Sequence, residues 1–382
     1  MEVRIMSWNM AGAKLFEQLD QKPEFVDHYI AAYQKVWLNH VLPWLDSESG
    51  SEEASGGERP DIILLQECIG LKDHSDSPSG RWQGGELILQ QIFVGYECFF
   101  FPAVTSSHNA HPGKWNRTIE GGRAENTPPA EVERQQGYGI CIRKGVSQRK
   151  LWVPWADAVD IPEGADRAEP GCNACFETVN LTTTLYQGSR DTEPRLVIMG
   201  RVKLESEGES RYLNYLNVHL NTVSGEREGD PDRDREASAS RLKQVELILD
   251  HVVAAYQQAN QYRMPEAQQE DIWIMGGDFN AEPGSAEIEK ILASGFVDTL
   301  TDKHIEGEES GNLLNNKTGS KWSLIDRARP PLVADYIFCG MVPTPPTAGG
   351  VNLSGSRRPF TPHFEDETFA TDHALLFTAI HW

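Results

Sequence analysis

Two short apolar runs constrain the fold of this chain more than any other feature. They are DIILLQE at residues 61–67 and IWIMGGD at residues 272–278. A strand with consecutive apolar side chains is covered on both faces, as in a sheet packed between other layers. Covering layers of helices on such strands predict an α/β protein. Each run also ends in an acidic residue, so we expect Glu67 and Asp278 to lie where buried strands leave the core.

The remaining strand patterns are irregularly spaced and outnumber the helices, which favours a mixed or antiparallel sheet layered with helices over regular βαβ winding. Residues 2–8 alternate between apolar and polar side chains, as in a half-buried strand. Further strand patterns lie at 137–145, 195–204, 212–221, 332–339 and 372–380.

Three segments have helical spacing. The first covers about residues 24–42 and is predicted to stop at Pro43. The third begins after Ser285 as a candidate N-cap and ends at Gly295. The predicted buried face of this third helix is Ile288, Ile291 and Leu292. The second helix has one apolar face, which consists of Leu242, Val245, Leu249, Val252, Val253 and Tyr256.

Side chains suited to chemistry recur where the predicted strands begin or end. In a mixed sheet, the C-terminal end of one strand lies beside the N-terminal start of an antiparallel neighbour, so we expect these side chains to converge on one rim. The set consists of Asn9, Glu67, His219, Asp278, Asn280, Asp335, Asp372 and His373.

Taken singly, each of these residues also has a structural explanation. Asp278 and Asn280 follow two glycines and suit a turn, and His219 suits a hydrogen-bonded core position. Taken together, the oxygen ligands suit Mg²⁺, which binds few protein carboxylates and leaves room for a substrate phosphate. The histidines, each near an acid, suit proton transfer or charge stabilisation. The set therefore favours metal-assisted attack of water on phosphorus.

The acidity of the chain limits its partners. The sequence holds 35 Lys and Arg against 57 Asp and Glu, a formal net charge of −22. Long nucleic acids are usually held by a basic surface, because affinity comes from cations that contact phosphates. Long duplex DNA is therefore disfavoured, while a nucleotide or a single-stranded or terminal phosphodiester fits a local basic patch.

Targeting and cysteine signals are weak. No run of about eighteen apolar residues occurs, and the N-terminal MEVRIMSWNM alternates instead of resembling a signal peptide, so we expect a cytoplasmic protein without membrane contact. Of six cysteines, only Cys172 and Cys175 form a C-x-x-C. We expect free thiols, the alternative being a zinc site completed by His108 or His111.

Seven sequence blocks, in chain order, resemble the motif series of the endonuclease/exonuclease/phosphatase superfamily, a group that includes pancreatic-type deoxyribonucleases, deadenylases and inositol polyphosphate phosphatases. The resemblance covers residues 3 to about 380 and implies one catalytic domain, 1–382. It also implies a four-layer sandwich of two packed mixed sheets flanked by helices. The blocks are MSWNMAG, LLQECIG, GYGICIRKG, NVHLNT, MGGDFNAEPGSAEIEKILASGFVDT, VADYIF and TDHALL. Loop insertions are predicted near 70–85, 104–136, 154–173, 223–237 and 303–330.

The resemblance also implies a role for each residue. Glu67 would be the principal ligand of Mg²⁺, or of Mn²⁺ as a substitute, with support from Asn9 and, on the metal side, Asp372. Asp278 would orient or deprotonate the attacking water, and Asn280 would hold a phosphate oxygen.

Two histidines complete the implied site. His373 would contact the scissile phosphate while bonded to Asp335, which fixes its tautomer and favours its charged form. His219 would stabilise the pentacovalent charge or protonate the leaving oxygen.

Some positions depart from the family pattern or bear on its branches. Ala374 and Ala334 stand where members commonly have Pro and Arg, which puts nearby substrate contacts in doubt. The HL block at His219 and the helix containing Arg241 and Gln244 resemble the deadenylase and DNA-end-processing branches more than the abasic-site branch.

The substrate is the open question of the sequence. The best local basic cluster lies in residues 105–136, and Arg357 with Arg358 forms a second cluster. Either could clamp a phosphate, although charged loops are often only solvated. The first cluster consists of His108, His111, Lys114, Arg117, Arg123 and Arg134. A nuclease or a nucleotide- or end-processing phosphodiesterase fits the sequence. The alternatives are a phosphatase of a phosphorylated small molecule or lipid headgroup, and a catalytically silent phosphate- or protein-binding relative.

Overall fold

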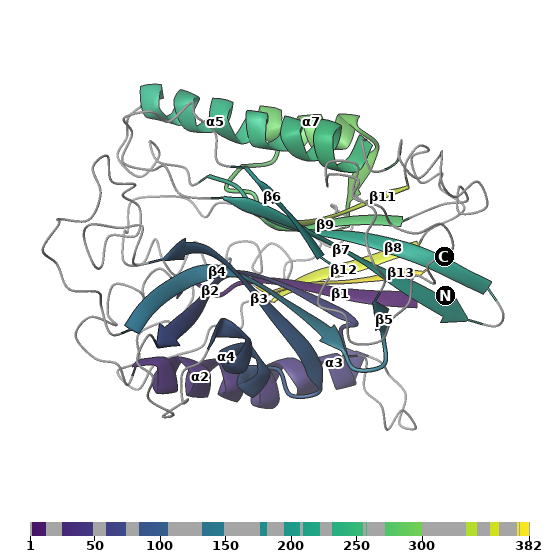
Figure 1. Cartoon of the computed structure of the whole chain (residues 1–382). Helices are drawn as coiled ribbons and strands as arrows, with labels where there is room; N and C mark the ends of the chain where they lie inside the picture. Colours follow the sequence, from purple (N-terminus) through teal and green to yellow (C-terminus); the bar gives the residue numbers. More distant parts are fainter. Residues whose placement is uncertain are drawn as a thin grey trace, which may run out of the picture.

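In the computed structural model, two mixed β-sheets lie face to face, and helices cover the outer face of each sheet (Figure 1). The predicted α/β sandwich of two packed mixed sheets flanked by helices is therefore confirmed. Among the residues described, no helix is long and apolar enough to cross a membrane. The structure describes residues 2–12, 25–48, 59–73, 84–105, 132–148, 176–181, 195–206, 209–221, 231–254, 257, 272–299, 334–341, 352–358, 373 and 375–381.

The first sheet contains six strands in the order β12, β13, β1, β2, β4, β3. Helices α2, α3 and α4 lie on its outer face, at the bottom of Figure 1. The strands are β1 (Glu2–Asn9), β2 (Ile62–Asp73), β3 (Tyr96–Thr105), β4 (Val132–Arg143), β12 (Asn352–Arg358) and β13 (Leu375–His381), and the helices are α2 (Phe25–Val36), the π-helix η1 (Trp37–Val41), α3 (Leu42–Glu48) and α4 (Gly84–Ile92).

The second sheet contains seven strands in the order β10, β11, β9, β8, β7, β5, with β6 paired to β7. Helices α5 and α7 cover its outer face, at the top of Figure 1. The strands are β5 (Ser147–Gln148), β6 (Phe176–Asn180), β7 (Leu196–Ser206), β8 (Glu209–His219), β9 (Ile272–Asp278), β10 (Phe296–Asp298) and β11 (Asp335–Met341), and the helices are α5 (Pro231–Glu246), the π-helix η4 (Leu247–Ala254) and α7 (Ala286–Ala293).

Each sheet holds one parallel pair among antiparallel neighbours. In the first sheet β1 pairs with β2, and in the second β8 pairs with β9. An antiparallel strand enters beside each pair: β11 begins with Asp335 opposite Asp278, and β13 begins just after His373. The ends of the two parallel pairs and the starts of these antiparallel strands supply the predicted rim.

The sheets meet through an apolar layer crossed by a few buried amides. This layer includes Ile5 and Leu64 from the first sheet and Leu213 and Ile274 from the second. A Cβ added to Gly276 would lie 2.9 Å from Leu64 Cδ1, so glycine allows the sheets to approach closely here.

An amide bridge spans the same layer behind the rim. Gln66 Nε2 donates to Asn217 Oδ1 at 2.7 Å, and Asn217 Nδ2 donates to the carbonyls of Leu65 and Gly139 at 2.9 and 3.0 Å. Because buried amides are costly unless bonded, this pairing fixes one relative placement of the two sheets.

Two helix predictions were wrong in part. The first helix does not stop at Pro43 but continues through η1 and α3. Leu42 N–H bonds Trp37 O in the π-helical turn, and Pro43 follows as the second residue of α3. In α7, Ile288 and Ile291 are buried as predicted but Leu292 is 38% exposed. Glu287 is buried instead, because its carboxylate pairs with Arg241 of α5 at 3.0 Å.

Regular structure extends into three of the predicted insertions. Strand β2 runs to Asp73, β4 starts at Val132 and α5 starts at Pro231. The extension of β2 and β4 comes from their antiparallel pairing, which continues to Asp73 and Val132 themselves. The predicted insertions at 154–173 and 303–330 lie outside the described residues.

Candidate active site

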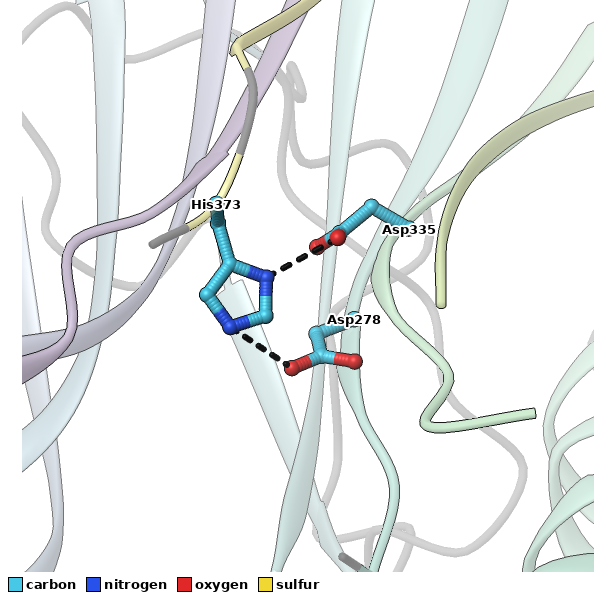
Figure 2. A group of neighbouring side chains, drawn as sticks. All are labelled: Asp278, Asp335 and His373. Carbon is cyan, nitrogen blue, oxygen red and sulfur yellow. Dashed lines mark hydrogen bonds and ion pairs between the residues drawn. The ribbon is translucent and has the colours of Figure 1, made fainter. Parts of the chain in front are cut away.

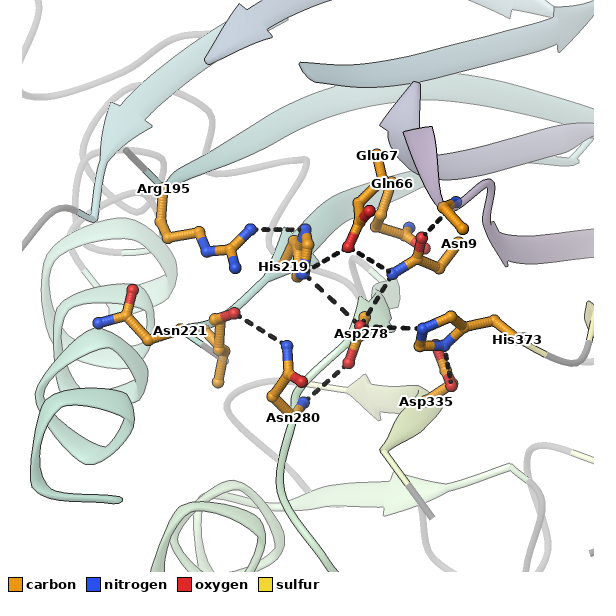
Figure 3. Close-up of polar contacts among 12 residues, drawn as sticks. Asn9, Gln66, Glu67, Arg195, His219, Asn221, Asp278, Asn280, Asp335 and His373 are labelled. Atoms are coloured by element: carbon orange, nitrogen blue, oxygen red, sulfur yellow. Dashed lines mark hydrogen bonds and ion pairs between the residues drawn. The ribbon is translucent and has the colours of Figure 1, made fainter. Parts of the chain in front are cut away.

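Asp278 lies at the centre of a polar cluster between the two sheets (Figure 3). Its side chain is 2% exposed. Oδ2 accepts a 2.9 Å hydrogen bond from Asn9 Nδ2, and Oδ1 accepts one of the same length from the backbone N–H of Asn280. The Nε2 atoms of His219 and His373 lie 3.6 and 3.8 Å from Oδ2. Residues from both sheets thus converge on one carboxylate.

The local backbone explains why glycine and asparagine flank Asp278. Gly277 has φ +152°, and a Cβ on it would lie 1.8 Å from the Val218 carbonyl oxygen. Asn280 has φ +49°, a left-handed conformation that Asn tolerates better than most residues. Its Nδ2 donates to the Leu220 carbonyl at 3.1 Å, which turns the chain back toward β8.

Glu67 enters the cluster from a β-bulge. The sequence placed it at the C-terminal end of its strand, but β2 continues to Asp73, and its register with β4 shifts between Leu65 and Cys68. Glu67 itself has φ +50°. Bulges often redirect a side chain beside an active site. Here the bulge lets Glu67 accept from Asn9 Nδ2 at 3.4 Å and from Gln136 Nε2 at 3.2 Å.

His373 and Asp335 form a bonded pair at the edge of the cluster (Figure 2). His373 Nδ1 lies 2.9 Å from Asp335 Oδ2, and its Nε2 faces Asp278. The His373 carbonyl accepts a 3.1 Å hydrogen bond from Trp8 Nε1, which ties this segment to β1. Ligand atoms of Asp278, Asp335 and His373 all lie within 4.8 Å of one another.

His219 has a different second partner. Its Nδ1 lies 2.9 Å from Arg195 Nη1, while its Nε2 faces Asp278 and, at 3.8 Å, Glu67 Oε1. Arg195 precedes β7 and is 3% exposed. The guanidinium is therefore enclosed on the far side of the imidazole from the carboxylates, as Figure 3 shows.

Burial and neighbouring charge shift the protonation of this cluster. Burial, then the Asp335 carboxylate, raises the pKa of Asp278 to about 7, against opposing effects of His373 and the Asn280 N–H. Burial, then the Arg195 charge and His373, holds the pKa of His219 well below its usual value. Burial also lowers the pKa of Arg195. The cluster thus combines a carboxyl that titrates near neutrality with a neutral imidazole.

The structure brings together seven of the predicted site residues: Glu67 comes from a bulge within β2, and the others come from strand ends or the residues beside them. Gln136 and Arg195 also belong to the cluster but were missed. Lys114, Arg117, Arg123, Asp372, Cys172 and Cys175 lie outside the described residues. Arg357 and Arg358 are in β12, opposite Leu376 and Leu375 of β13. The seven residues are Asn9, Glu67, His219, Asp278, Asn280, Asp335 and His373.

Helix α5 contains Arg241 and Gln244, the residues that resemble the deadenylase and DNA-end-processing branches. It stabilises the chain segment next to the site. Gln244 of α5 accepts from Asn221 N–H at 3.0 Å and donates to Asn221 Oδ1 at 3.1 Å. Asn221 lies two residues after His219 and also donates to Ser240 Oγ at 2.7 Å. These bonds hold the chain after β8, whereas Arg241 contacts Glu287 of α7.

The donor chemistry fits a divalent cation. The carboxylates of Glu67, Asp278 and Asp335 all lie in or beside the buried cluster, and Asp335 and Glu67 both raise the pKa of Asp278. Mutually repelling carboxylates of this kind are stabilised by a hard cation. Asn9 presents Nδ2, not Oδ1, to the carboxylates, because Oδ1 accepts from the Ala11 N–H at 2.9 Å.

Comparison with known proteins gives one family match. A sequence model described as Endonuclease/Exonuclease/phosphatase family matches residues 6–373. The search of curated proteins finds no match. The matched span contains every site residue described above.

Similar solved structures cover the whole chain. Humanized D. rerio TDP2 is 15% identical with a TM-score of 0.48, covering 100% of this chain and 99% of its own. The human Nocturnin catalytic domain with bound sulfate is 15% identical with a TM-score of 0.46, covering 100% and 94%. An endonuclease/exonuclease/phosphatase from Bacteroides vulgatus is 13% identical with a TM-score of 0.46, covering 100% and 99%.

Proposed function

The chain belongs to the endonuclease/exonuclease/phosphatase family, and from this premise we propose that it is a divalent-metal-dependent hydrolase of a phosphodiester or phosphomonoester. One observation carries the proposal: the buried Asp278 carboxylate faces the Nε2 atoms of two histidines, His219 and His373, at 3.6 and 3.8 Å. An acid and two imidazoles around one point are the groups needed to activate water and to stabilise charge on a phosphoryl group.

Asp278 is the proposed base. In the metal-free protein its pKa is raised to about 7, within the range of a general base that acts near neutral pH. The Asn9 amide and the Asn280 N–H hold its two oxygens, so its orientation is fixed before substrate binds. We assign Asn9 to positioning Asp278 and Glu67 instead of to metal ligation, since its Nδ2 faces both carboxylates.

Glu67 is the proposed principal metal ligand. Gln136 holds one of its oxygens and leaves the other facing the site, where it lies near Asn9 and His219. When bound there, Mg²⁺, or Mn²⁺ in its place, supplies a Lewis acid for a phosphoryl oxygen and offsets the clustered negative charge. Asp335 accepts from His373 Nδ1–H and so aims Nε2 at the scissile phosphate.

The proposed substrate presents one accessible phosphoester: a strand end, a nucleotide or a short single strand. A net charge of −22 opposes the counterion-release binding that long duplex DNA requires. The polar groups of the site surround one carboxylate, that of Asp278, so a single phosphate group of the substrate is enough to occupy the site.

A phosphoester panel tests the proposal. The protein is incubated with bis-p-nitrophenyl phosphate, p-nitrophenyl phosphate, single-stranded DNA, RNA, nucleotides and inositol phosphates at matched ionic strength, with Mg²⁺, Mn²⁺ or chelator. We expect metal-dependent turnover that is strongly reduced in Asp278→Asn and Glu67→Gln and retained in Asp250→Asn, which changes an exposed position in η4. Absence of metal-dependent turnover across the panel would favour a catalytically silent binding protein.

A further inference from the structure

The two histidines of the site have second partners of opposite charge. His373 Nδ1 meets the Asp335 carboxylate, and His219 Nδ1 meets the Arg195 guanidinium, each at 2.9 Å. A carboxylate accepts a hydrogen bond and a guanidinium only donates. The two rings must therefore carry their protons differently.

The Arg195 contact determines the tautomer of His219. Because the guanidinium donates, Nδ1 must be the acceptor, and the single ring proton of the neutral imidazole is on Nε2. Nε2 is buried and makes no hydrogen bond among the residues that the structure describes. It lies 3.6 Å from Asp278 Oδ2 and 3.8 Å from Glu67 Oε1. A buried donor without an acceptor is rare, and one aimed into a catalytic cluster indicates a ligand oxygen.

We propose that Arg195 is a positioning residue that holds His219 as the neutral Nε2–H tautomer, so that His219 donates a hydrogen bond to a non-bridging phosphoryl oxygen and keeps its proton throughout the reaction. The hydrogen bond from His219 to a phosphoryl oxygen rests on the proposed function. The tautomer of His219 rests on the contact between Arg195 and His219 alone. Of the two roles open for His219 from the sequence, charge stabilisation is selected and protonation of the leaving oxygen is not.

The surroundings of Arg195 show a fixed position. Its carbonyl accepts a 2.8 Å hydrogen bond from the Leu181 N–H, and the N–H of the next residue, Leu196, donates to Tyr138 OH at 3.0 Å. The guanidinium also bonds the Tyr138 side chain. A buried cation donating to Nδ1 makes the Nε2–H a stronger donor, since it withdraws electron density from the ring. Such a preorganised donor acts where charge develops in the transition state.

The protonation of His219 agrees with this assignment. Burial, the Arg195 charge and His373 hold its pKa well below the usual value. The charged and titratable groups that face the ring are Arg195, Tyr138, Glu67, Asp278 and His373. Two histidines with environments that differ in this way divide the work of a site between them.

Imidazole ¹⁵N NMR tests the tautomer without requiring activity. In metal-free protein labelled at histidine, the His219 signals are assigned by their loss in His219→Gln. We expect a protonated Nε2 and an unprotonated Nδ1 from pH 6 to 8. Arg195→Met is expected to give a tautomer mixture or a titrating ring. The matched control is Arg201→Met, which removes another buried arginine, also 3% exposed, from β7. It should leave the His219 signals unchanged.

Several outcomes would overturn the role of Arg195. They are a wild-type Nδ1–H tautomer, a wild-type imidazolium in this pH range, or a tautomer unaffected by Arg195→Met. If Arg195→Met does not fold, Arg195→Lys is measured instead. A lysine that donates to Nδ1 should preserve the Nε2–H tautomer of His219. An Arg195→Lys variant with full activity but an altered His219 tautomer would contradict the proposal.

Kinetics separates this inference from the proposed function. We expect Arg195→Met to lower kcat about 10- to 100-fold, with a smaller effect on KM and partial recovery in Arg195→Lys. If wild type hydrolyses no phosphoester, the proposed function fails while the NMR result still decides the tautomer. If wild type is active and His219 is in the other tautomer, the role of Arg195 alone fails.

Discussion

His219 and Asp278 are register partners at the ends of the parallel strands β8 and β9, and Nε2 of the histidine lies 3.6 Å from Oδ2 of the aspartate. The sheet itself brings the two side chains together, without a long loop. In the first sheet, β1 and β2 are also parallel and deliver Asn9 and Glu67. Strand pairing therefore places the backbones of Asn9, His219 and Asp278, and the bulge in β2 that follows Gln66 turns Glu67 into the same cluster.

Replacement of Asp278 by Asn should separate activity from stability. We expect kcat to fall about 10²- to 10⁴-fold, because the proposed base is lost while the shape of the side chain is kept. In chelator at pH 8, the free energy of unfolding should rise, since a buried carboxylate that repels Asp335 and Glu67 has been removed. Steady-state kinetics and urea denaturation measure the two effects. A variant that keeps full activity would remove Asp278 from the mechanism.

The stability of the metal-free protein should depend on pH through Asp278. Its pKa rises from 3.8 to about 7 on folding, so between these values the folded protein keeps a proton that the unfolded chain has lost. Its contribution to the free energy of unfolding therefore declines as the pH rises from about 4 to 7.

His219 acts in the opposite direction, because its pKa is lowered on folding and stability is lost as the pH falls below 6.5. The difference between wild type and Asp278→Asn isolates the Asp278 effect, measured by urea denaturation at pH 5, 6, 7 and 8. That difference should decrease with pH.

Addition of Mg²⁺ at pH 6 in weak buffer should release protons, since the cation favours the ionised carboxylate.

Asp335→Asn should impair the His373 pair. An amide can present its NH₂ to Nδ1 and favour the wrong tautomer, so we expect kcat to fall about 10²-fold or more with little change in stability. The matched control Asp250→Asn changes an exposed aspartate in η4. Comparable kcat values for the two variants would show that the bond between Asp335 and His373 has no catalytic role.

The buried pair between α5 and α7 should matter for stability alone. Glu287→Gln removes the carboxylate charge opposite the buried Arg241 guanidinium, and such changes cost about 3–5 kcal/mol. Glu289→Gln, at an exposed position in the same helix, should cost little. Urea denaturation measures both, and kcat of the folded protein is expected to stay unchanged. A large loss of kcat in Glu287→Gln would instead connect α7 with catalysis.

Much of the site was readable because strand periodicity is local. The runs before Glu67 and Asp278 identify buried strands from a few adjacent residues, and the ends of neighbouring strands share an edge. The convergence of seven polar residues followed from that rule together with the family resemblance. Their chemical roles stay predictions.

The features that were missed depend on contacts between distant segments. The bulge at Glu67 requires the pairing of β2 with β4, which no local pattern specifies. Arg195 and Glu287 carry charges, which are usually exposed, but each is buried beside a partner that is distant in the sequence. Arg195 contacts His219, 24 residues away, and Glu287 contacts Arg241, 46 residues away. Charged residues are rarely buried unless paired, and the partner is not visible in the sequence.

Asn9 and Glu67 of the site come from one sheet, and His219 and Asp278 come from the other. The width of the site is therefore set by the thickness of the apolar layer between the two sheets. Gly276 and Leu64 lie at a narrow point of that layer. An added or deleted methyl group there would change the distance between the reacting groups of the two sheets without replacing any of these groups. Relatives with identical polar residues could therefore differ in rate, or in the size of phosphoester they accept, through core volume alone.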